Sequence, residues 1–485
     1  MNFSIIVRFI GILLVIEGLF ILTALPFSYY YGGSDFNAIL ISGLITIAFG
    51  ILFRLITNEA NEKSIGKREG YVIVSFAWII ISIFGTLPFI LTNSIPSFTD
   101  AFFETISGFS TTGASILTDI EVVPKGVLFW RSMTHWIGGM GIIVLTVAIL
   151  PFLGIGGMQL FNAESSGIST DKLHPRITET AKRLWGIYVL LTATQTVLLL
   201  LGDMNLFESL CHAFGTMGTG GFSPKNTSIG QYSPYIQYVC IVFMMLASTS
   251  FTLHYFALKG KLKKVYKNEE FRLFLTIIFG SSLLIATFLF FDKYNQYDDF
   301  EKAFRDSWFT VSSIVSCTGF VTADYMKWSP FLWFLIFLLM FSGGCAGSTT
   351  GGIKVIRHLM LLKNASMEFK RLLHPSAILP VRLDGKPVHQ DIIFNILAFF
   401  MMYIIIFAVS SFLLSFTGVN PISSMGAVAT CMAGIGPGLG DVGGPATNFS
   451  MVPIMGKWIL SFMMLIGRLE IFTVFILFAP SFWKR

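Results

Sequence analysis

The most informative segment of this 485-residue chain is 96–115, PSFTDAFFETISGFSTTGAS. The partly apolar stretch Pro96–Phe109 is too short to cross the hydrocarbon core of a bilayer as a helix. It ends in a turn of small residues, Ser110–Ser115. Backbone that leaves a helix inside a membrane is tolerated only where protein encloses it or water reaches it. The stretch therefore predicts a short helix and a turn that enter the membrane and line a watery path.

The composition of the whole chain agrees with a membrane location. Hydrophobic residues make up 54% of the chain and charged residues 12%, which is about half the charged share of a soluble domain. A soluble globular fold is therefore excluded. Ten stretches are long and apolar enough to cross as helices, namely residues 9–28, 37–56, 71–93, 132–155, 184–202, 235–258, 273–291, 329–361, 392–416 and 456–480. The first could also be a signal peptide, but its apolar run is long for one, and we expect a retained helix.

The placement of charge predicts the orientation. Most of the 33 Lys and Arg residues fall on one side of the membrane when the amino terminus is cytoplasmic, as the positive-inside rule requires. We therefore expect a multi-pass protein of the cytoplasmic (inner) membrane with both termini in the cytoplasm. The opposite loops are rich in Asp and Glu. These acids either simply tolerate translocation or concentrate cations at a vestibule, and the sequence leaves both readings open.

The short helix and turn recur four times after the first two spans. The short helices are predicted over 96–109, 205–217, 300–317 and 420–433, and the turns read Ser110-Thr-Thr-Gly-Ala-Ser115, Gly218-Thr-Gly-Gly-Phe222, Ser316-Cys-Thr-Gly-Phe320 and Gly434-Ile-Gly-Pro-Gly438. We align the four turns on Gly113, Gly220, Gly319 and Gly436. Four such units can surround one axis, where glycine lets carbonyl oxygens face inward and replace the water around an alkali cation. Close helix packing is the alternative for a single glycine, but it does not explain four at one position of a repeat.

The predicted fold is an all-α polytopic membrane protein with four units of span, short helix, turn and span around a pseudo-fourfold pore. We expect an extra helix pair over 1–68 and pore repeats over 69–180, 181–270, 271–388 and 389–485. The eighth span should be broken at Ser342–Gly352, which holds five glycines, because each interior Gly costs about 1 kcal/mol relative to Ala. A phosphate-binding P-loop is excluded there, since Ile353 occupies the Lys position and no strand precedes it.

Several motifs resemble those of the Trk/Ktr/HKT superfamily of potassium transporters, most closely its TrkH branch of potassium-uptake subunits. Besides the four turns, they are Trp136–Ile142, Pro151–Gln159, Gly343–Thr349, Gly436–Gly440 and Gly467–Phe472. The resemblance spans the whole chain. It implies a homodimeric subunit that takes up potassium and is built like four fused M1-P-M2 units of potassium channels. It also implies regulation by a cytoplasmic nucleotide-binding ring, TrkA.

The resemblance also assigns site residues. The potassium filter would comprise Thr111, Thr112, Gly113, Thr219, Gly220, Cys317, Thr318, Gly319, Ile435 and Gly436. The gate would be an intramembrane loop below the filter together with Arg468, the loop being Gly343, Gly344, Cys345, Ala346, Gly347, Ser348, Thr349, Thr350, Gly351 and Gly352. Relatives that pass sodium have serine in place of Gly113, so potassium is the expected ion. The fourth turn departs from the pattern, with Ala433-Gly434-Ile435 where polar residues are expected.

Arg468 lies near the middle of the last predicted span. A charge at that depth costs at least about 2.5 kcal/mol and should face protein or water. The resemblance implies a pore-facing charge that opposes a descending cation. An interhelical salt bridge without a role in transport is the alternative, although Glu470 falls on a different helix face. We expect His135, His212 and His254 to pack rather than to bind metal, because no short-spaced metal motif joins them.

The basic stretch 354–386 is explained by orientation alone or by contact with anionic lipid, and the resemblance adds docking of the TrkA ring. We expect no cofactor in this chain and no nucleic-acid partner. The five cysteines are scattered, and G-x-S-x-G and HExxH motifs are absent from the sequence, so we do not expect an enzyme. The alternative functions are an ion-coupled transporter, with potassium carried in symport with protons or sodium, and a less selective monovalent-cation channel.

Overall fold

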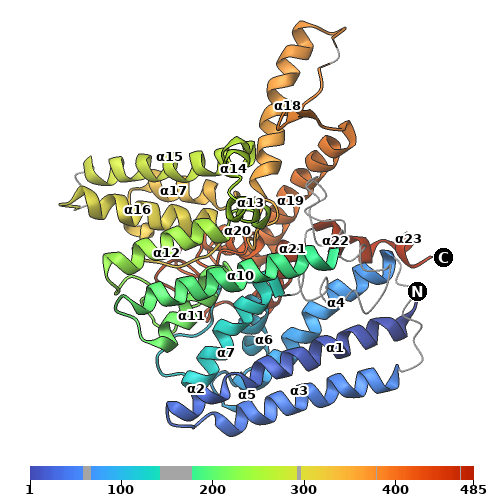
Figure 1. Ribbon diagram of the computed structural model, residues 1–485, viewed down its shortest axis with the longest axis vertical. Helices are drawn as coiled ribbons and strands as arrows, with labels where there is room; N and C mark the ends of the chain where they lie inside the picture. The colour runs from blue at the N-terminus through green and yellow to red at the C-terminus, as the bar shows by residue number, and fades with distance from the viewer. Residues whose placement is uncertain (58–66, 142–176, 292–296, 378, 470, 485) are drawn as a thin grey trace.

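The computed structural model describes residues 1–57, 67–141, 177–291, 297–377, 379–469 and 471–484. The chain is a helical membrane protein that crosses the bilayer several times, and one two-stranded hairpin accompanies the helices of the described residues (Figure 1). Most of the predicted span 132–155 and the whole of the predicted motif Pro151–Gln159 lie outside the described residues.

The extra amino-terminal pair consists of α1 (Phe3–Leu22), a short α2 (Leu25–Tyr30) and α3 (Phe36–Ile56). Glycines bring α1 and α3 into close contact. A Cβ atom added to Gly11 would lie 2.7 Å from the carbonyl oxygen of Gly50, and one added to Gly18 would lie 2.8 Å from that of Gly43. Small residues of this kind let membrane helices approach backbone to backbone.

The remaining helices repeat one order: a long helix, a short buried helix and a second, interrupted helix. The first set is α4 (Lys67–Gly85), α5 (Leu87–Leu91), α6 (Phe98–Phe109), α7 (Lys125–Trp136) and the π-helix η2 (Ile137–Gly141). The second is α10 (Ile177–Leu200), α11 (Leu206–Met217), α12 (Pro234–Ala247), α13 (Phe251–Leu258) and α14 (Leu262–Lys267). The third is α15 (Glu269–Phe291), α16 (Phe300–Val315), η5 (Tyr325–Lys327), α17 (Pro330–Leu339) and α18 (Val355–Leu373).

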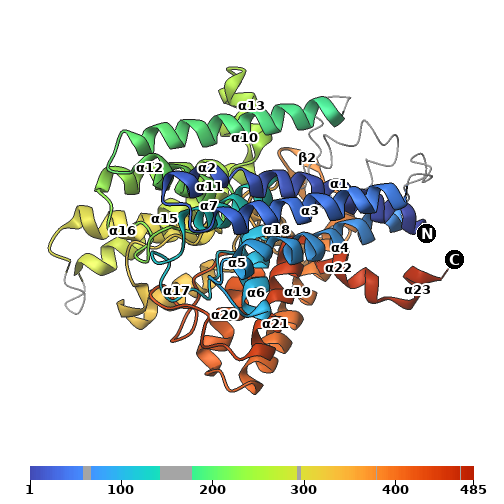
Figure 2. The same cartoon turned by 90° about the horizontal axis from the view of Figure 1, so that it is seen from below.

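A hairpin of β1 (Arg382–Leu383) and β2 (Lys386–Pro387) follows α18, with Arg382 opposite Pro387. The fourth set is α19 (Gln390–Phe416), α20 (Pro421–Ala433), α21 (Ile454–Leu469), α22 (Ile471–Phe475), η6 (Ile476–Phe478) and α23 (Pro480–Trp483). Figure 2 places α10 and α12 on one side, α15 and α16 on a second, and α19 to α21 opposite α10. In Figure 1, α18 projects from the bundle with the hairpin, and the two chain ends lie close together.

The four short helices α6, α11, α16 and α20 confirm the predicted repeat. Each begins where a polar side chain accepts a backbone N–H of the first turn, which satisfies a donor that the helix itself leaves unpaired. The capping residues are Ser97, Asn205, Asp299 and Asn420. All four helices are largely buried. They are therefore enclosed by the protein, as a helix that ends within a membrane must be.

Among the described residues, six helices are long and apolar enough to span a membrane, and up to eight spans result when each of two bent pairs counts as one. The predicted break in the eighth span is confirmed, since α17 ends at Leu339 and α18 begins at Val355. The prediction of an unbroken span over 235–258 was wrong, because α12 and α13 meet at 102°. The hydroxyls of Ser248 and Thr249 bond to carbonyls in the last turn of α12, which helps to end it there. The predicted span 456–480 is likewise bent, by 113°.

Candidate functional site

The four turns that follow the short helices share one unusual backbone shape. Each has a residue with positive φ one or two residues after the end of the helix, and a glycine with positive φ two residues later. The first position is held by Thr111, Thr219, Cys317 and Gly434, with φ of 55°, 54°, 54° and 70°. The glycines are Gly113, Gly221, Gly319 and Gly436, with φ of 79°, 76°, 80° and 99°. Positive φ is rare for a β-branched residue, so its recurrence in two threonines indicates that each turn is held by its surroundings.

Backbone hydrogen bonds fix the register of the repeat. The residue between the two positive-φ positions donates its N–H to a carbonyl five residues earlier in the short helix. These donors are Thr112, Gly220, Thr318 and Ile435, and their N–O distances run from 2.8 to 3.0 Å. Gly220 therefore occupies the position in its turn that Thr112 occupies in the first turn, not the position of Gly113. The alignment on Gly220 was off by one residue, and Gly221 takes the glycine position of the second turn.

The four turns close into a ring. A Cβ atom added to any of the four glycines would lie within 3.0 Å of a carbonyl oxygen of the next turn. Gly113 meets the carbonyl of Gly220, Gly221 that of Thr318, Gly319 that of Ile435, and Gly436 that of Thr112. The carbonyl at the middle position of each turn thus lies against the glycine of an adjacent turn, all the way round the ring. Carbonyl oxygens grouped around one axis can replace the water of a monovalent cation.

The unusual fourth turn keeps the same geometry. Gly434 has the positive φ that Thr111, Thr219 and Cys317 adopt with a side chain, and the carbonyl of Ile435 stands in the ring. The side chains differ more than the backbone does. Ser110 and Ser316 bond to the hydroxyls of Thr112 and Thr318 at 2.8 and 2.7 Å, whereas the fourth turn is apolar. The departure in sequence therefore changes the support behind the ring and leaves its backbone unchanged.

The predicted loop at 342–352 lies against the ends of the short helices. The hydroxyl of Thr349 donates to the carbonyl of Met217, the last residue of α11, at 3.0 Å, and its carbonyl accepts from the hydroxyl of Thr219 at 3.0 Å. A Cβ atom on Gly351 would lie 2.5 Å from the carbonyl oxygen of Ala433 at the end of α20. One on Gly352 would lie 3.4 Å from the sulfur of Cys317, just after α16. The loop thus contacts the carboxyl ends of three short helices.

The loop is bonded to the neighbouring break between α12 and α13. The N–H of Cys345 donates to the carbonyl of Ser248 at 2.9 Å, and the N–H of Phe251 donates to the carbonyl of Gly347 at 3.0 Å. Its own ends are tied together, because Gly343 donates to the carbonyl of Ile353 at 2.7 Å. Backbone groups that two interrupted helices leave unpaired therefore satisfy each other inside the protein, which buried peptide groups require.

Arg468 contacts this loop from α21. Its guanidinium donates to the carbonyl of Thr349 at 2.7 Å, and to the carbonyls of Gly138 and Gly139 in η2, the latter at 2.8 Å. Arg468 thus joins the loop of the third set of helices to the interrupted helix of the first. Glu470, the residue weighed against it in the sequence, lies outside the described residues.

Comparison with known proteins agrees with this architecture. Residues 36–485 match the family model TrkH, described as a cation transport protein. The chain belongs to the TrkH family. The Trk system potassium uptake protein TrkH of Escherichia coli K12 is 39% identical over 490 residues, covering 100% of both chains. The Trk system potassium uptake protein TrkG of the same strain is 35% identical over 432 residues, covering 88% of each.

A solved structure is also similar over the full length. The crystal structure of the potassium transporter TrkH from Vibrio parahaemolyticus has a TM-score of 0.89 and 36% sequence identity, and it covers 100% of both chains. The expectation of a polytopic all-α membrane protein of this superfamily is therefore confirmed. As a member of the TrkH family the chain is a cation transport protein and not an enzyme.

Sequence reasoning missed Glu270, at the start of α15. One carboxylate oxygen of Glu270 accepts the N–H of Ala346 at 2.7 Å and that of Ile356 at 3.2 Å, so it joins the middle of the loop to the first turn of α18. Its neighbour Glu269 binds the N–H of Asp384 in the hairpin at 3.0 Å and the amine of Lys363 at 2.5 Å. Two adjacent acids in an otherwise basic stretch were the signal available in the sequence.

The three histidines take part in packing, as predicted. His135 stacks on Phe222 with ring centroids 4.0 Å apart, His212 lies 3.0 Å from the hydroxyl of Ser223, and His254 lies 2.8 Å from the carbonyl of Leu246. Within the part of the chain that the structure describes, no group of three or more His, Cys, Asp or Glu residues could hold a metal ion.

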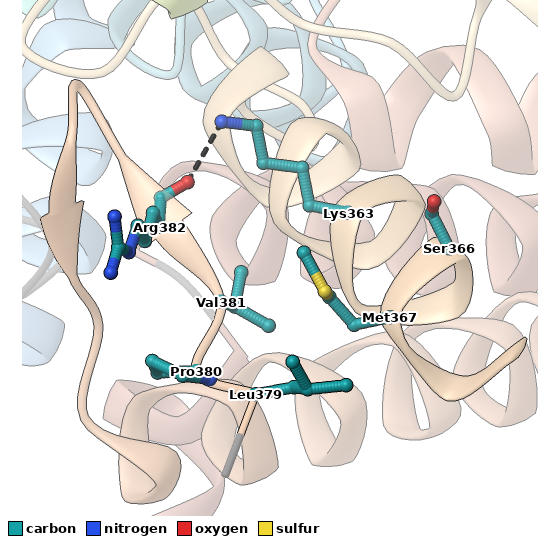
Figure 3. A pocket seen from close by; sticks show the side chains of 7 residues that line it. All are labelled: Lys363, Ser366, Met367, Leu379, Pro380, Val381 and Arg382. Atoms are coloured by element: carbon teal, nitrogen blue, oxygen red, sulfur yellow. Dashed lines mark hydrogen bonds between the residues drawn. The ribbon is translucent and has the colours of Figure 1, made fainter. Parts of the chain in front are cut away.

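A pocket lies between α18 and the segment 379–382, which leads into the hairpin (Figure 3). Met367, Leu379 and Val381 form apolar walls, and the amine of Lys363 donates to the carbonyl of Arg382 at 2.8 Å. The pocket falls inside the basic stretch 354–386, for which the resemblance to the superfamily implies a docking partner.

Proposed function

We propose that this chain takes potassium into the cell across the cytoplasmic membrane, through a filter formed by the ring of four turns. One observation carries the proposal. The carbonyls of Thr112, Gly220, Thr318 and Ile435 each lie against a glycine of the adjacent turn in a closed ring. Such a ring offers oxygen ligands to a dehydrated monovalent cation. The two relatives from E. coli, which are named potassium uptake proteins, favour potassium as the ion.

The ends of the short helices support selection for cations. Each short helix leads into its turn at the carboxyl end. The carboxyl end of a helix carries roughly half a negative charge. With the helix ends gathered around one loop, a cation below the ring is favoured and an anion is repelled. The proposed filter comprises the residues expected from the sequence, with one change: Gly221 takes the glycine position of the second turn, and Gly220 contributes a carbonyl oxygen instead.

The gate in this proposal is the loop 342–352 together with Arg468. Contacts with α11, α16 and α20 support a position across the path below the ring. Arg468 adds a positive charge that opposes a descending cation and a bond that holds Thr349 in place. Passage then requires the loop to move away from the short helices.

The remaining parts of the proposal concern assembly and regulation. We include a homodimer in the inner membrane, with both termini in the cytoplasm, and control by a TrkA-type ring docked on the basic surface of α18 and the hairpin. A common side for the two termini is supported by two bonds at the start of α4. The N–H of Asn2 donates to the carboxylate of Glu69 at 3.2 Å, and Arg68 donates to the carbonyl of Lys484 at 2.7 Å. The pair Glu269–Lys363 joins α18 to α15, next to Glu270. A partner that pulls on α18 therefore acts close to the loop.

Uptake of rubidium or potassium into liposomes that contain the purified chain tests the proposal. Cation uptake down its own gradient, without an imposed proton or sodium gradient, is the expected result. Uptake that appears only with such a gradient would favour ion-coupled symport instead. Equal uptake of sodium and potassium would support the less selective channel. Failure of the chain to raise cation uptake above empty liposomes, in the folded state, would refute the proposal.

A further inference from the structure

A buried ion pair lies directly behind the first two turns of the ring. Glu104 on α6 and Arg131 on α7 are joined by an Nε–Oε1 distance of 2.7 Å. Their side chains are 0% and 2% exposed. Removing one partner of such a buried pair leaves an uncompensated charge, which is strongly destabilising. The position of the pair is therefore defined sharply by the surrounding protein.

Glu104 holds the backbone that follows the first turn. Its Oε1 atom accepts from the hydroxyl of Ser115 at 2.9 Å, and its Oε2 atom accepts the N–H of Ile116 at 2.9 Å. Ser115 is two residues beyond the ring glycine Gly113. Hydrogen bonds to a carboxylate are stronger than those between neutral groups. Glu104 thus joins the segment that follows the first turn to α6.

Arg131 extends the tie to the second turn. Its Nη1 group donates to the carbonyl of Ser223 at 3.1 Å, and its guanidinium lies 3.5 Å from the ring centroid of Phe222. One helical turn further along α7, His135 stacks on the same Phe222 ring and accepts its backbone N–H at 3.3 Å. Phe222 directly follows the ring glycine Gly221. One face of α7 therefore holds the segment that follows the second turn.

The arrangement distinguishes the first two turns from the others. Glu104 precedes Thr111 by seven residues, and His212 precedes Thr219 by the same seven. His212 lies 3.0 Å from the hydroxyl of Ser223, the counterpart of Ser115. The corresponding residues of the third and fourth units are Thr310 and Ala427, which carry no charge. A series of hydrogen bonds thus crosses from the first turn to the second on one side of the ring. It runs through Ser115, Glu104, Arg131, Ser223 and His212.

We propose that Glu104 and Arg131 are positioning residues that set the distance between the first two turns, and thereby the preference of the ring for potassium over sodium. The inference rests on the proposed function. The ion pair joins the segment that follows the first turn to the segment that follows the second. The contact between Gly113 and the carbonyl of Gly220 lies between these two segments. A change in the distance between these segments therefore changes the position of the Gly220 carbonyl. Neither side chain touches the ion.

The test compares potassium and sodium uptake by the full chain in liposomes. Glu104→Gln keeps the shape and one acceptor oxygen but removes the charge, and Arg131→Met removes the other charge. We expect each single variant to lower the potassium-to-sodium uptake ratio by about fivefold or more, the lower end of ordinary coupling between distinct sites. The double variant should lower it by less than the two single effects combined, because the two residues act as one unit.

A second ion pair on the same helix provides the control. Lys457 and Asp100 are 2.6 Å apart, with Asp100 in the first turn of α6, at the end far from the ring. Asp100→Asn should leave the uptake ratio within about twofold of the unmodified chain, the usual effect of a minor perturbation of about 0.4 kcal/mol. A merely structural role for Glu104 and Arg131 would lower the thermal stability of the protein and leave the ratio unchanged.

The possible outcomes are distinct. An unchanged ratio in folded Glu104→Gln and Arg131→Met, with a selective unmodified chain, overturns the inference and leaves the proposed function standing. An unmodified chain without cation uptake refutes the proposed function itself. If Glu104→Gln does not fold, Arg131→Lys decides, because it keeps the charge but cannot reach both Glu104 and Ser223 with one planar group. A ratio that stays unchanged in that variant also overturns the inference.

Discussion

Arg468→Ala should increase cation uptake in liposomes by at least about tenfold. The guanidinium donates to the carbonyl of Thr349 in the loop at 2.7 Å, while its other described acceptors, Gly138 and Gly139, belong to η2. A hydrogen bond from a charged group contributes about 1.5–3 kcal/mol net. Loss of the single bond to Thr349 therefore favours release of the loop by roughly ten- to a hundredfold.

Loss of the charge acts in the same direction, because a positive charge on the path repels an approaching cation. Arg468→Lys separates the two effects. Lysine keeps the charge but is a point donor without the planar fork of arginine, so it cannot bridge the loop and η2 in the same way. We expect an uptake rate between those of the unmodified chain and Arg468→Ala.

The assay is rubidium uptake by matched amounts of reconstituted protein, with size-exclusion profile and thermal stability as controls for folding. An uptake rate in folded Arg468→Ala that equals or falls below that of the unmodified chain would refute the reasoning. Equal rates for Arg468→Lys and the unmodified chain, with a raised rate for Arg468→Ala, would show that the charge alone forms the barrier.

Three further predictions concern the ring and the loop. Gly113→Ser should lower the potassium-to-sodium uptake ratio, because the backbone there has a φ of 79° and any Cβ overlaps the carbonyl of Gly220; an unaltered ratio would remove Gly113 from the filter. Gly221→Ala should lower the stability of the protein by at least about 1–2 kcal/mol for the left-handed backbone alone, measured by thermal unfolding in detergent, whereas Gly280→Ala on α15, with open space around it, should not destabilise. Glu270→Gln should raise basal rubidium uptake roughly fivefold, because two bonds to a charged acceptor become bonds to a neutral one. Glu269→Gln is the matched control, because Glu269 binds the N–H of Asp384 in the hairpin and the amine of Lys363 on α18 rather than the loop. Similar uptake by both glutamine variants would contradict the role of Glu270 in holding the loop.

The short helices could be predicted because their signals are local. Each one is a partly apolar segment with a capping residue before it and a small-residue turn after it, as at Asn205 and Gly218. The break before α18 was equally local, since Ser342–Gly352 is rich in glycine and cannot continue a helix cheaply. The length of a membrane-crossing helix and the positions of glycine were therefore enough to predict most of the architecture.

The register of the second turn could not be predicted, for a physical reason. Gly220 and Gly221 are adjacent, and either can adopt positive φ without steric cost. The choice is made by the neighbouring turn, because Gly221 lies against the carbonyl of Thr318 while Gly220 packs against the ring of His135. Contacts between segments far apart in the sequence decided the position, and a local pattern does not contain them.

The break between α12 and α13 was missed on the same grounds, and it bears on how the path opens. Ser248-Thr249-Ser250 contains neither Gly nor Pro, and hydroxyl bonds like those of Ser248 and Thr249 also occur inside the unbroken helix α3. The break therefore also depends on partners elsewhere, namely Cys345 and Gly347 of the loop. If the loop moves away, the carbonyl of Ser248 and the N–H of Phe251 both lose their partners. An unpaired backbone group out of water costs about 1–3 kcal/mol, so movement of the loop alone is opposed by both groups. Under the proposed function, the junction of α12 and α13 must therefore move with the loop, or water must enter beside it as the path opens.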